Sequence, residues 1–299
     1  MAATKEFREA SSNAGKEFSS LFTDLGSRKD VFSNVKAFSE TEEAKNLNPE
    51  NKRYLEEYLR GGRRGGLELP DEKLEKLKEI KKKISNLGTD FRNCLSEDTS
   101  YFWIDEADLE GVPADVIESM EQNDEGQRKV TTKYPHYNPV IKNAKNPKTR
   151  LTMETVYQKR CVEDNTPRIE ELVKLRHKKA QLLGYPTHAA YVQEEKMAKN
   201  PETVTNFLKT LKEKLQKLWS VEKEKLLKLK EAEFKEMGLE FDGKINKEDF
   251  WYYGNMINKL DYNVDSEKLK EYFPIEIVTN GMLKIYETLL GLKFTKIGL

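Results

Sequence analysis

Apolar residues recur at intervals of three and four along most of the 299-residue chain, a pattern typical of helices with one buried face. The clearest case begins at Pro70, which suits the first turn of a helix, and continues to about Cys94. The Lys81–Lys83 run lies mostly off the apolar stripe. The spacing therefore predicts a core-facing helix over 70–94. Its stripe consists of Leu74, Leu77, Ile80, Ile84, Leu87 and Phe91.

Proline and glycine divide the rest of the chain into further predicted helices. Pro147 and Pro167 stand where a helix tolerates a missing N–H, and Asn146 and Thr166 precede them as plausible N-caps. These helices predict a mainly α fold. They span Asn51–Leu59, Pro113–Met120, Pro147–Cys161, Pro167–Leu183, Asn246–Lys259, Ser266–Phe273 and Ile275–Leu290.

The longest predicted helix runs from Pro201 to Met237, just before Gly238. At 1.5 Å per residue it would span roughly 55 Å. Its apolar stripe lapses between Leu218 and Leu226, which disfavours a continuous coiled coil. The stripe comprises Val204, Phe207, Leu208, Leu211, Leu215, Leu218, Leu226, Leu229 and Met237.

Four segments lack helical periodicity. Tyr101–Ile104 is short and aromatic and predicts a strand or an extended plug, and Leu292–Phe294 reads as the start of a strand. Lys133–Pro139 predicts a structured loop, because each proline biases its predecessor away from helix. Arg60–Gly66 predicts a flexible connection with solvated arginines. The alternative for this last segment is contact with an anion or a peptide carboxylate, since the arginine fork suits carboxylates.

Charge and composition narrow the class of protein. Basic and acidic residues number 52 each, so the net charge is zero, whereas nucleic-acid-binding proteins usually carry a basic excess. We expect no nucleic-acid partner. No apolar run approaches the roughly 20 residues of a membrane helix, and the first 18 residues contain no signal-peptide core. The two cysteines, Cys94 and Cys161, have no CxxC spacing, which predicts reduced, packed thiols in a cytoplasmic protein.

The residues that usually hold a catalytic metal are scarce. The three histidines are His136, His177 and His188, and no two are four residues apart. Glu195 follows His188 by two helical turns, about 10 Å, which is too far to share one ion easily. His177 lies among basic residues, which disfavours a cation. Neither a phosphate-binding glycine motif nor a nucleophile elbow is present.

Adjacent carboxylates occur, for example, at Glu42–Glu43, Glu170–Glu171 and Glu194–Glu195. Successive helical residues point about 100° apart, so these pairs are predicted to be surface charge rather than acid–base pairs. We therefore assign no catalytic, cofactor-binding or metal-ligating residue to this chain.

Several irregular segments, taken in order and spacing, resemble the N-terminal half of the thimet oligopeptidase and neurolysin family of zinc endopeptidases. The resemblance covers roughly residues 19–294. Four positions depart from it, because the family usually has Asn at Gly65, His at Glu68, Phe at Asn138 and Asp at Ala190. The segments are Gly62–Pro70, Lys133–Pro139, Leu182–Ala189, Met197–Lys199, Phe241–Ile245, Tyr252–Tyr253, Glu271–Glu276 and Ile285–Phe294.

The resemblance implies a helical, two-lobed peptidase with a deep channel that admits only short peptides. In the family one zinc ion is held by an HExxH motif and a more distant glutamate. The motif's own glutamate activates the zinc-bound water, and the metal polarises the scissile carbonyl. These residues lie C-terminal of the matched segments and have no counterpart here, so no zinc is expected to bind this chain.

On this basis we expect three parts: a poorly ordered segment over 1–18, a helical lobe over 19–200, and the long helix with the start of the catalytic lobe over 201–299. The expected function is the N-terminal part of a zinc metalloendopeptidase that cuts short cytosolic peptides. Its expected partners are those peptides and a C-terminal catalytic half. The alternatives are an inactive helical module that binds peptides or proteins, and an elongated scaffold built on the Pro201–Met237 helix.

Overall fold

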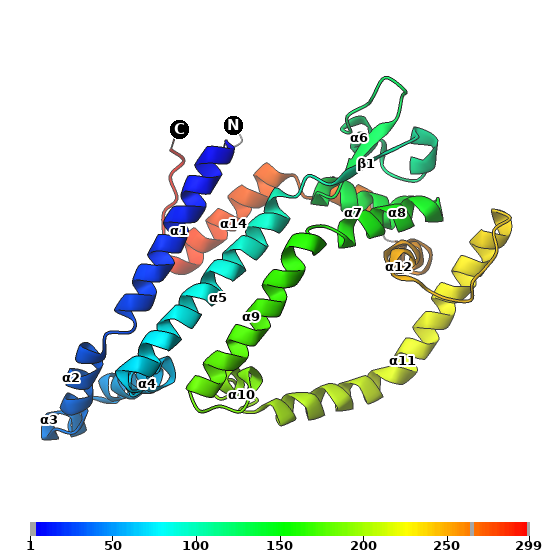
Figure 1. Ribbon diagram of the computed structural model, residues 1–299. Coiled ribbons are helices and arrows are strands. Elements are labelled where there is room, and N and C mark those ends of the chain that lie inside the picture. Colours follow the sequence, from blue (N-terminus) through cyan, green and yellow to red (C-terminus); the bar gives the residue numbers. More distant parts are fainter. Residues whose placement is uncertain (1–3, 264–265, 298–299) are drawn as a thin grey trace. The chain divides into compact units, whose positions relative to one another are not determined.

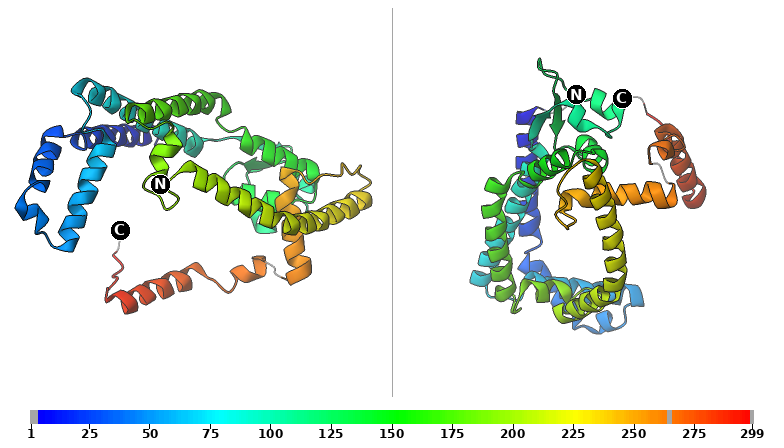
Figure 2. Two further views of the ribbon diagram at one scale, coloured as in Figure 1. Left: turned by 90° about the horizontal axis from the view of Figure 1, so that it is seen from below. Right: turned by 90° about the vertical axis from the view of Figure 1, so that its right-hand side faces the viewer.

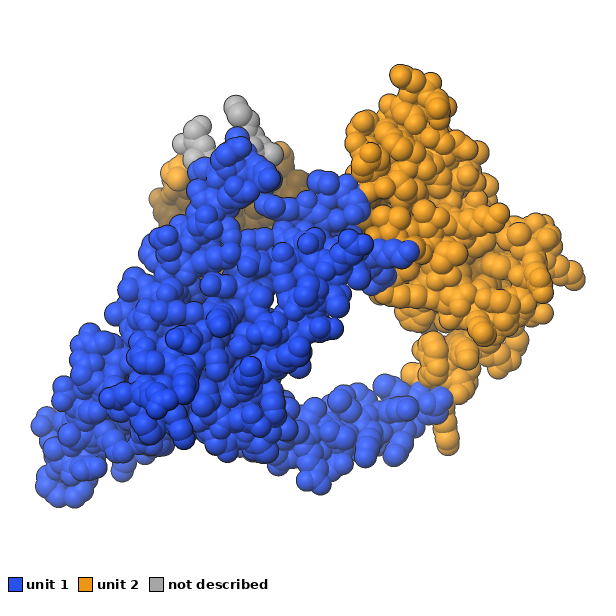
Figure 3. Space-filling model, in the orientation of Figure 1, with its two compact units in different colours: residues 1–100, 158–216 blue, residues 101–157, 217–299 orange. Residues whose placement is uncertain are grey.

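The computed structural model describes residues 4–263 and 266–297, and its contacts divide the chain into two compact units (Figures 1 and 3). Unit 1 comprises residues 1–100 and 158–216, and unit 2 comprises residues 101–157 and 217–299. Helices make up most of the described chain, so the predicted mainly α fold is confirmed. The two units alternate along the chain. The boundary expected at residue 200 separates lobes of a longer protein, so it stays a prediction.

Unit 1 is built on the long helix α5 (Asp71–Glu97), which packs along α9 (Val162–Leu182) and α1 (Lys5–Leu25) (Figures 1 and 2). Every residue of the predicted α5 stripe is buried or half-buried. The unit also contains α2 (Lys29–Ser39), α3 (Glu42–Lys45), α4 (Pro49–Gly65), α10 (His188–Gln193) and the first part of α11 (Pro201–Glu236).

The segment predicted as a flexible connection at Arg60–Gly66 is helical, because α4 continues through its glycines to Gly65. The reason is close packing. A Cβ atom at Gly62 would lie 2.3 Å from the buried Phe32 ring, so only glycine lets α4 approach α2 this closely. Gly66, at φ +92°, then ends the helix in the left-handed conformation that glycine favours. Here tertiary contact outweighs the low helix propensity of glycine.

The segment predicted to be poorly ordered is 1–18; residues 1–3 lie outside the described residues, and residues 5–18 lie in α1. No residue of this helix is buried, so apolar burial does not fix it. Polar contacts with α5 do. Lys16 Nζ lies 2.6 Å from Asp90 Oδ1, and the Ser19 and Ser85 hydroxyls are 2.6 Å apart. Apolar residues of α1 such as Phe7, Phe18 and Phe22 are more than half exposed, and the poor order expected for 1–18 stays a prediction.

Unit 2 contains β1 (Tyr101–Ile104), which pairs antiparallel with β2 (Arg128–Thr131). Tyr101–Ile104 is therefore a strand, one of the two predicted alternatives, and its partner was not foreseen. The helices of the unit are η1 (Glu106–Leu109), α6 (Ala114–Glu118), α7 (Tyr134–Asn143), α8 (Pro147–Gln158), the rest of α11, α12 (Lys247–Tyr262), α13 (Ser266–Lys270) and α14 (Ile275–Leu290).

Two apolar clusters stabilise unit 2. One joins the hairpin to α7 and α8, and the other joins α11 to α12 through Leu226, Tyr252 and Tyr253. Leu226 is the one apolar residue of α11 that is buried. The first cluster contains Leu109, Val112, Met120, Val130, Val140, Ala144 and Met153.

The loop predicted at Lys133–Pro139 forms the first part of α7. Pro135 lies in the first turn, where its missing N–H has no intrahelical partner to lose. Pro139 lies inside the helix and removes one hydrogen bond. Burial of Val140 and Ile141, which are 0% and 1% exposed, offsets this loss. The prediction from local proline rules was wrong because it ignored that burial.

The two helices predicted at Pro147–Cys161 and Pro167–Leu183 exist with shifted ends. The first ends at Gln158, and the second begins at Val162, five residues before Pro167. Between them Cys161 adopts a left-handed conformation at φ +53°. Thr166 is not an N-cap, because its hydroxyl donates to the Val162 carbonyl oxygen.

Much apolar surface of α11 and α14 is exposed to solvent. No residue of α14, all of which is described, is buried, and Ile275 and Leu289 are 77% and 75% exposed. The strand predicted at Leu292–Phe294 does not form, and these residues lie outside the helices and strands. Among residues 4–263 and 266–297, no helix has both the length and the apolar character to cross a bilayer.

Candidate functional site

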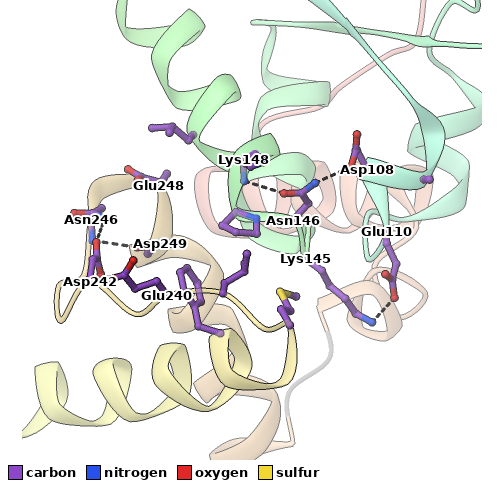
Figure 4. A pocket seen from close by; sticks show the side chains of 16 residues that line it. Asp108, Glu110, Lys145, Asn146, Lys148, Glu240, Asp242, Asn246, Glu248 and Asp249 are labelled. Carbon is purple, nitrogen blue, oxygen red and sulfur yellow. Dashed lines mark hydrogen bonds and ion pairs between the residues drawn. The ribbon is translucent and has the colours of Figure 1, made fainter.

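A cavity of about 630 Å³ in unit 2 lies between the N-terminal end of α8 and the turn that joins α11 to α12 (Figure 4). Leu151, Phe234, Met237 and Leu239 supply apolar lining. The site therefore combines an apolar surface with charges of both signs. Its charged lining comprises Asp108, Glu110, Lys145, Lys148, Glu240, Asp242, Glu248 and Asp249.

A buried ionic network lies at the wall formed by α11 and α12. Lys230 Nζ donates to Asp242 Oδ1 and to Asp249 Oδ2, each at 2.8 Å, and to the Lys244 carbonyl oxygen at 2.9 Å. The Lys230 and Asp249 side chains are each 2% exposed. Burial lowers the pKa of Lys230, but the two carboxylates outweigh burial and raise it. Lys230 is thus a charged lysine held inside the protein by paired carboxylates.

Asp242 and Asp249 belong to the turn after α11 and to the first turn of α12, respectively. Asp249 Oδ2 accepts from the Asn246 backbone N–H at 3.2 Å, which completes a capping box. Burial raises the pKa of Asp242, but hydrogen bonds from Lys230 and Asn246 reverse this effect and lower it to about 2. Figure 4 shows Asp242, Asn246 and Asp249 clustered on one side of the pocket.

Arg150 of α8 joins this network from the other side of Asp249. Its guanidinium donates to Asp249 Oδ1 at 3.2 Å and to the carbonyl oxygens of Ala144 and Lys145, each at 2.8 Å. The side chain is fully buried and lies 4.0 Å from the Tyr252 ring centroid, in cation–π contact. Arg150 therefore connects α8, the end of α7 and α12 through one side chain.

Tyr252 and Tyr253 both donate their hydroxyl hydrogens to the Glu233 carboxylate of α11, Tyr253 at 2.7 Å. Burial, and then these hydrogen bonds, raise the pKa of both tyrosines well above the usual value. Both therefore stay neutral donors at physiological pH, and they orient Glu233 rather than take part in proton transfer.

On the opposite side of the pocket, polar side chains also bind one another. Asn146 Nδ2 donates to Asp108 Oδ1 at 2.6 Å, and Lys145 pairs with Glu110 (Figure 4). Within the described parts of the chain, Lys148, Glu240 and Glu248 make no ion pair. The charges of these three lining residues are therefore available to pair with a bound molecule.

The structure does not bring the histidines together. His136 Nδ1 accepts from the Thr131 backbone N–H at 3.2 Å, and burial lowers the pKa of this histidine. His177 is exposed on α9. Burial and then the charges of Arg176 and Lys179 lower the pKa of His188, whose Nδ1 is buried. In residues 4–263 and 266–297, no three His, Cys, Asp or Glu side chains gather as a metal site.

Glu194 and Glu195, predicted to be divergent surface charges, instead converge on Arg64. Arg64 Nε lies 3.0 Å from Glu195 Oε1, and another guanidinium nitrogen contacts Glu194. The convergence is possible because α10 ends at Gln193, so the two glutamates do not follow one another on a regular helix. Arg64 is only 10% exposed and also lies 4.5 Å from the Tyr191 ring centroid.

The contacts of Arg64 agree with neither prediction for the Arg60–Gly66 segment, a solvated arginine or an arginine bound to an anion or a peptide carboxylate. The side chain is not solvated, and its fork is occupied by carboxylates of its own chain rather than by a peptide carboxylate. Lys81, which the sequence placed off the core stripe, donates to the Gly65 carbonyl oxygen at 2.8 Å. Burial, followed by the charge of Lys179, lowers the pKa of Lys81 to about 8.

The mainly α fold and the pocket leave the class of protein open. Comparison with known proteins gives its class. Residues 140–298 match peptidase family M3. The chain is 37% identical to saccharolysin of Saccharomyces cerevisiae over 298 residues, which is 97% of this chain and 42% of saccharolysin.

Other relatives agree. Identity is 34% over 256 residues to the thimet-like oligopeptidase of Dictyostelium discoideum, covering 84% of this chain and 38% of that protein. It is 28% over 303 residues to oligopeptidase A of Salmonella typhimurium, covering 96% and 44%. The chain belongs to peptidase family M3 and spans about two fifths of the length of these relatives, which confirms the resemblance seen in the sequence.

Proposed function

We propose that this chain is the N-terminal, substrate-contacting part of a cytoplasmic zinc metalloendopeptidase that acts on short peptides. The observation that carries the proposal is the 37% identity to saccharolysin along 97% of the chain. The whole peptidase's activity would need the HExxH-bearing region that the family resemblance implies C-terminal of the matched segments. This chain's own contribution is steric selection of short substrates and non-covalent contact with them.

Zinc itself does not fit the side chains described here. Catalytic zinc takes three protein ligands that converge on one point, and the described residues provide no such group. Four carboxylates of the pocket already bind Asn146, Lys145, Lys230 or Arg150, and Glu240 and Glu248 alone cannot supply three ligands; the four are those of Asp108, Glu110, Asp242 and Asp249. No catalytic step is therefore assigned to residues of this chain.

The pocket in unit 2 supports peptide contact. Apolar residues such as Leu151 and Phe234 offer a surface to apolar side chains. Lys148 suits a peptide carboxylate, and Glu240 and Glu248 suit an amino group or a basic side chain. The buried ionic network behind the wall keeps α11 and α12 in fixed positions, so the binding surface is preorganised.

The exposed apolar faces of α11 and α14 support a second element of the proposal. Large apolar patches on a soluble protein mark interaction sites, and α14 is apolar on several sides. In the whole peptidase we propose that these faces pack against the C-terminal catalytic region. That region and short peptides are the partners expected for this chain.

A chimera tests the proposal. Residues 1–299 would replace the matching N-terminal part of saccharolysin, and cleavage of a quenched fluorescent peptide would be measured with and without a zinc chelator. We expect chelator-sensitive cleavage by the chimera and none by this chain alone. The control is the same chimera with the glutamate of its HExxH motif changed to glutamine.

Two results would contradict the proposal. One is a folded, zinc-loaded chimera without activity. The other is chelator-sensitive cleavage by residues 1–299 alone. Tight peptide binding by the chain alone, together with an inactive chimera, would favour the alternative of a non-catalytic binding module.

A further inference from the structure

The two cysteines, 67 positions apart in the sequence, meet in unit 1 where the end of α5 packs against the start of α9. Cys94 lies in the last turn of α5, and Cys161 directly precedes α9. Both thiols are free and half-buried. The absence of a CxxC spacing in the sequence gave no sign of this proximity.

Several hydrogen bonds fix the two cysteines near one another. Cys94 Sγ donates to Asp164 Oδ2 at 3.8 Å, and Asp164 lies three residues after Cys161. Asn165 reaches both segments, because its backbone N–H donates to the Cys161 carbonyl oxygen at 2.8 Å and its Nδ2 donates to the Phe91 carbonyl oxygen at 3.2 Å. Asn165 is only 6% exposed. The helix ends are thus held together independently of the thiols.

The surroundings of the Cys161 thiol disfavour its ionised form. Burial, then a hydrogen bond with Cys94, and then the charges of Asp98 and Asp164 raise the pKa of Cys161 to about 11. The Cys161 thiol is therefore protonated at neutral pH, and it must lose its proton before it attacks a disulfide.

We propose that Cys94 and Cys161 form a reversible intramolecular disulfide that links α5 to α9. The oxidant is a low-molecular-weight disulfide of the glutathione class. The Cys94 thiolate attacks one sulfur of the small disulfide, forms a mixed disulfide and releases one small thiolate. Cys161 then loses its proton and attacks the Cys94 sulfur, which releases the second small thiolate. The two protein thiols lose two electrons, the small disulfide gains them, and two protons pass to the released thiolates.

The position of the Cys94–Cys161 disulfide determines which part of the chain it would constrain. The chain leaves unit 1 after Ser100 and returns to it at Gln158. A Cys94–Cys161 disulfide would therefore close a loop that contains all of β1 to α8. It would tie together the ends of α5 and α9 that carry this segment, and it would restrict their fraying. Disulfides of this kind inside cells are usually transient and redox-responsive.

The test uses the whole chain, which has no other cysteine. Reduced protein would be incubated with oxidised glutathione and then examined by intact mass, peptide mapping and thermal melting. We expect a monomer lighter by two hydrogen atoms, a Cys94–Cys161 cross-linked peptide, and a melting temperature higher by roughly 5–10 °C that returns on reduction.

Matched variants sharpen the result. Cys94→Ser and Cys161→Ser should each retain one glutathione at the remaining cysteine and show no rise in melting temperature. Stable glutathione adducts on both cysteines of the wild type, disulfide-linked dimers as the main product, or thiols that stay free would each overturn the proposal. None of these results depends on peptidase activity, so this test and that of the proposed function fail separately.

Discussion

The two halves of α11 carry similar apolar stripes and have opposite surroundings. In the first half Phe207 and Leu208 are 65% and 55% exposed, whereas in the second half Leu226 is 4% exposed. The second half also buries a charge, Lys230, at 2% exposure. An amphipathic stripe therefore predicts which face of a helix seeks a partner, and the neighbouring chain decides whether a partner is present. Residues elsewhere in unit 2, from α12 and the preceding turn, provide that partner only to the second half.

The largest effect should come from breaking the buried network at Asp249. Asp249→Ala leaves Lys230 and Arg150 buried without their shared carboxylate, so the free energy of unfolding of unit 2 should fall by about 3–5 kcal/mol. Urea unfolding of the variant and the wild type would measure this difference in the free energy of unfolding. Asp261→Ala on the same helix is the matched control, because the Lys225–Asp261 pair is 58% and 43% exposed and should contribute less than about 1 kcal/mol. Equal losses for the two variants would contradict the network's role.

A pair of leucine truncations compares the halves of α11 directly. Leu226→Ala removes packing from the cluster with Tyr252 and Tyr253 and should cost about 2–4 kcal/mol. Leu211 lies in the first half and is 40% exposed, so Leu211→Ala should change the free energy of unfolding by about 0.5 kcal/mol or less. Chemical denaturation of both variants checks the difference. A loss at Leu211 as large as that at Leu226 would show that the first half is packed in solution.

The smallest effect concerns acid. The pKa of Asp242 falls from an unfolded value of about 3.9 to about 2 in the folded protein. Its contribution to stability is therefore complete above pH about 4 and is lost as the pH falls toward about 2. Because its side chain is 42% exposed, we expect only about 1 kcal/mol. Asp242→Asn should flatten this part of the pH dependence of unfolding, and Asp261→Asn should leave it intact.

The sequence predicted the regular parts of the fold well, because periodic stripes such as that of α5 report burial directly. It failed where a residue broke a local rule for a tertiary reason. Gly62 lies in a helix because Phe32 approaches it, and Pro139 lies in a helix because Val140 and Ile141 are buried. Neither reason is visible without the neighbouring elements.

The site was harder to predict than the fold. Lys230 looks like a surface lysine in a helix rich in lysine, and its partners Asp242 and Asp249 follow 12 and 19 residues later. The one usable signal was the capping pattern of Asn246 followed by Asp249, which marks the start of α12. The meeting of Cys94 with Cys161 and of Arg64 with Glu194 depends on helix packing, so sequence spacing contained no sign of either.

We propose that the exposed apolar faces of α11 and α14 belong to the interior of a longer peptidase. The direct measurement is the binding of a hydrophobic dye and the melting temperature of residues 1–299, alone and within the saccharolysin chimera. We predict strong dye binding and concentration-dependent association for the chain alone, and little dye binding with a higher melting temperature for the chimera. A sharply melting, monomeric chain that binds no dye by itself would contradict the claim.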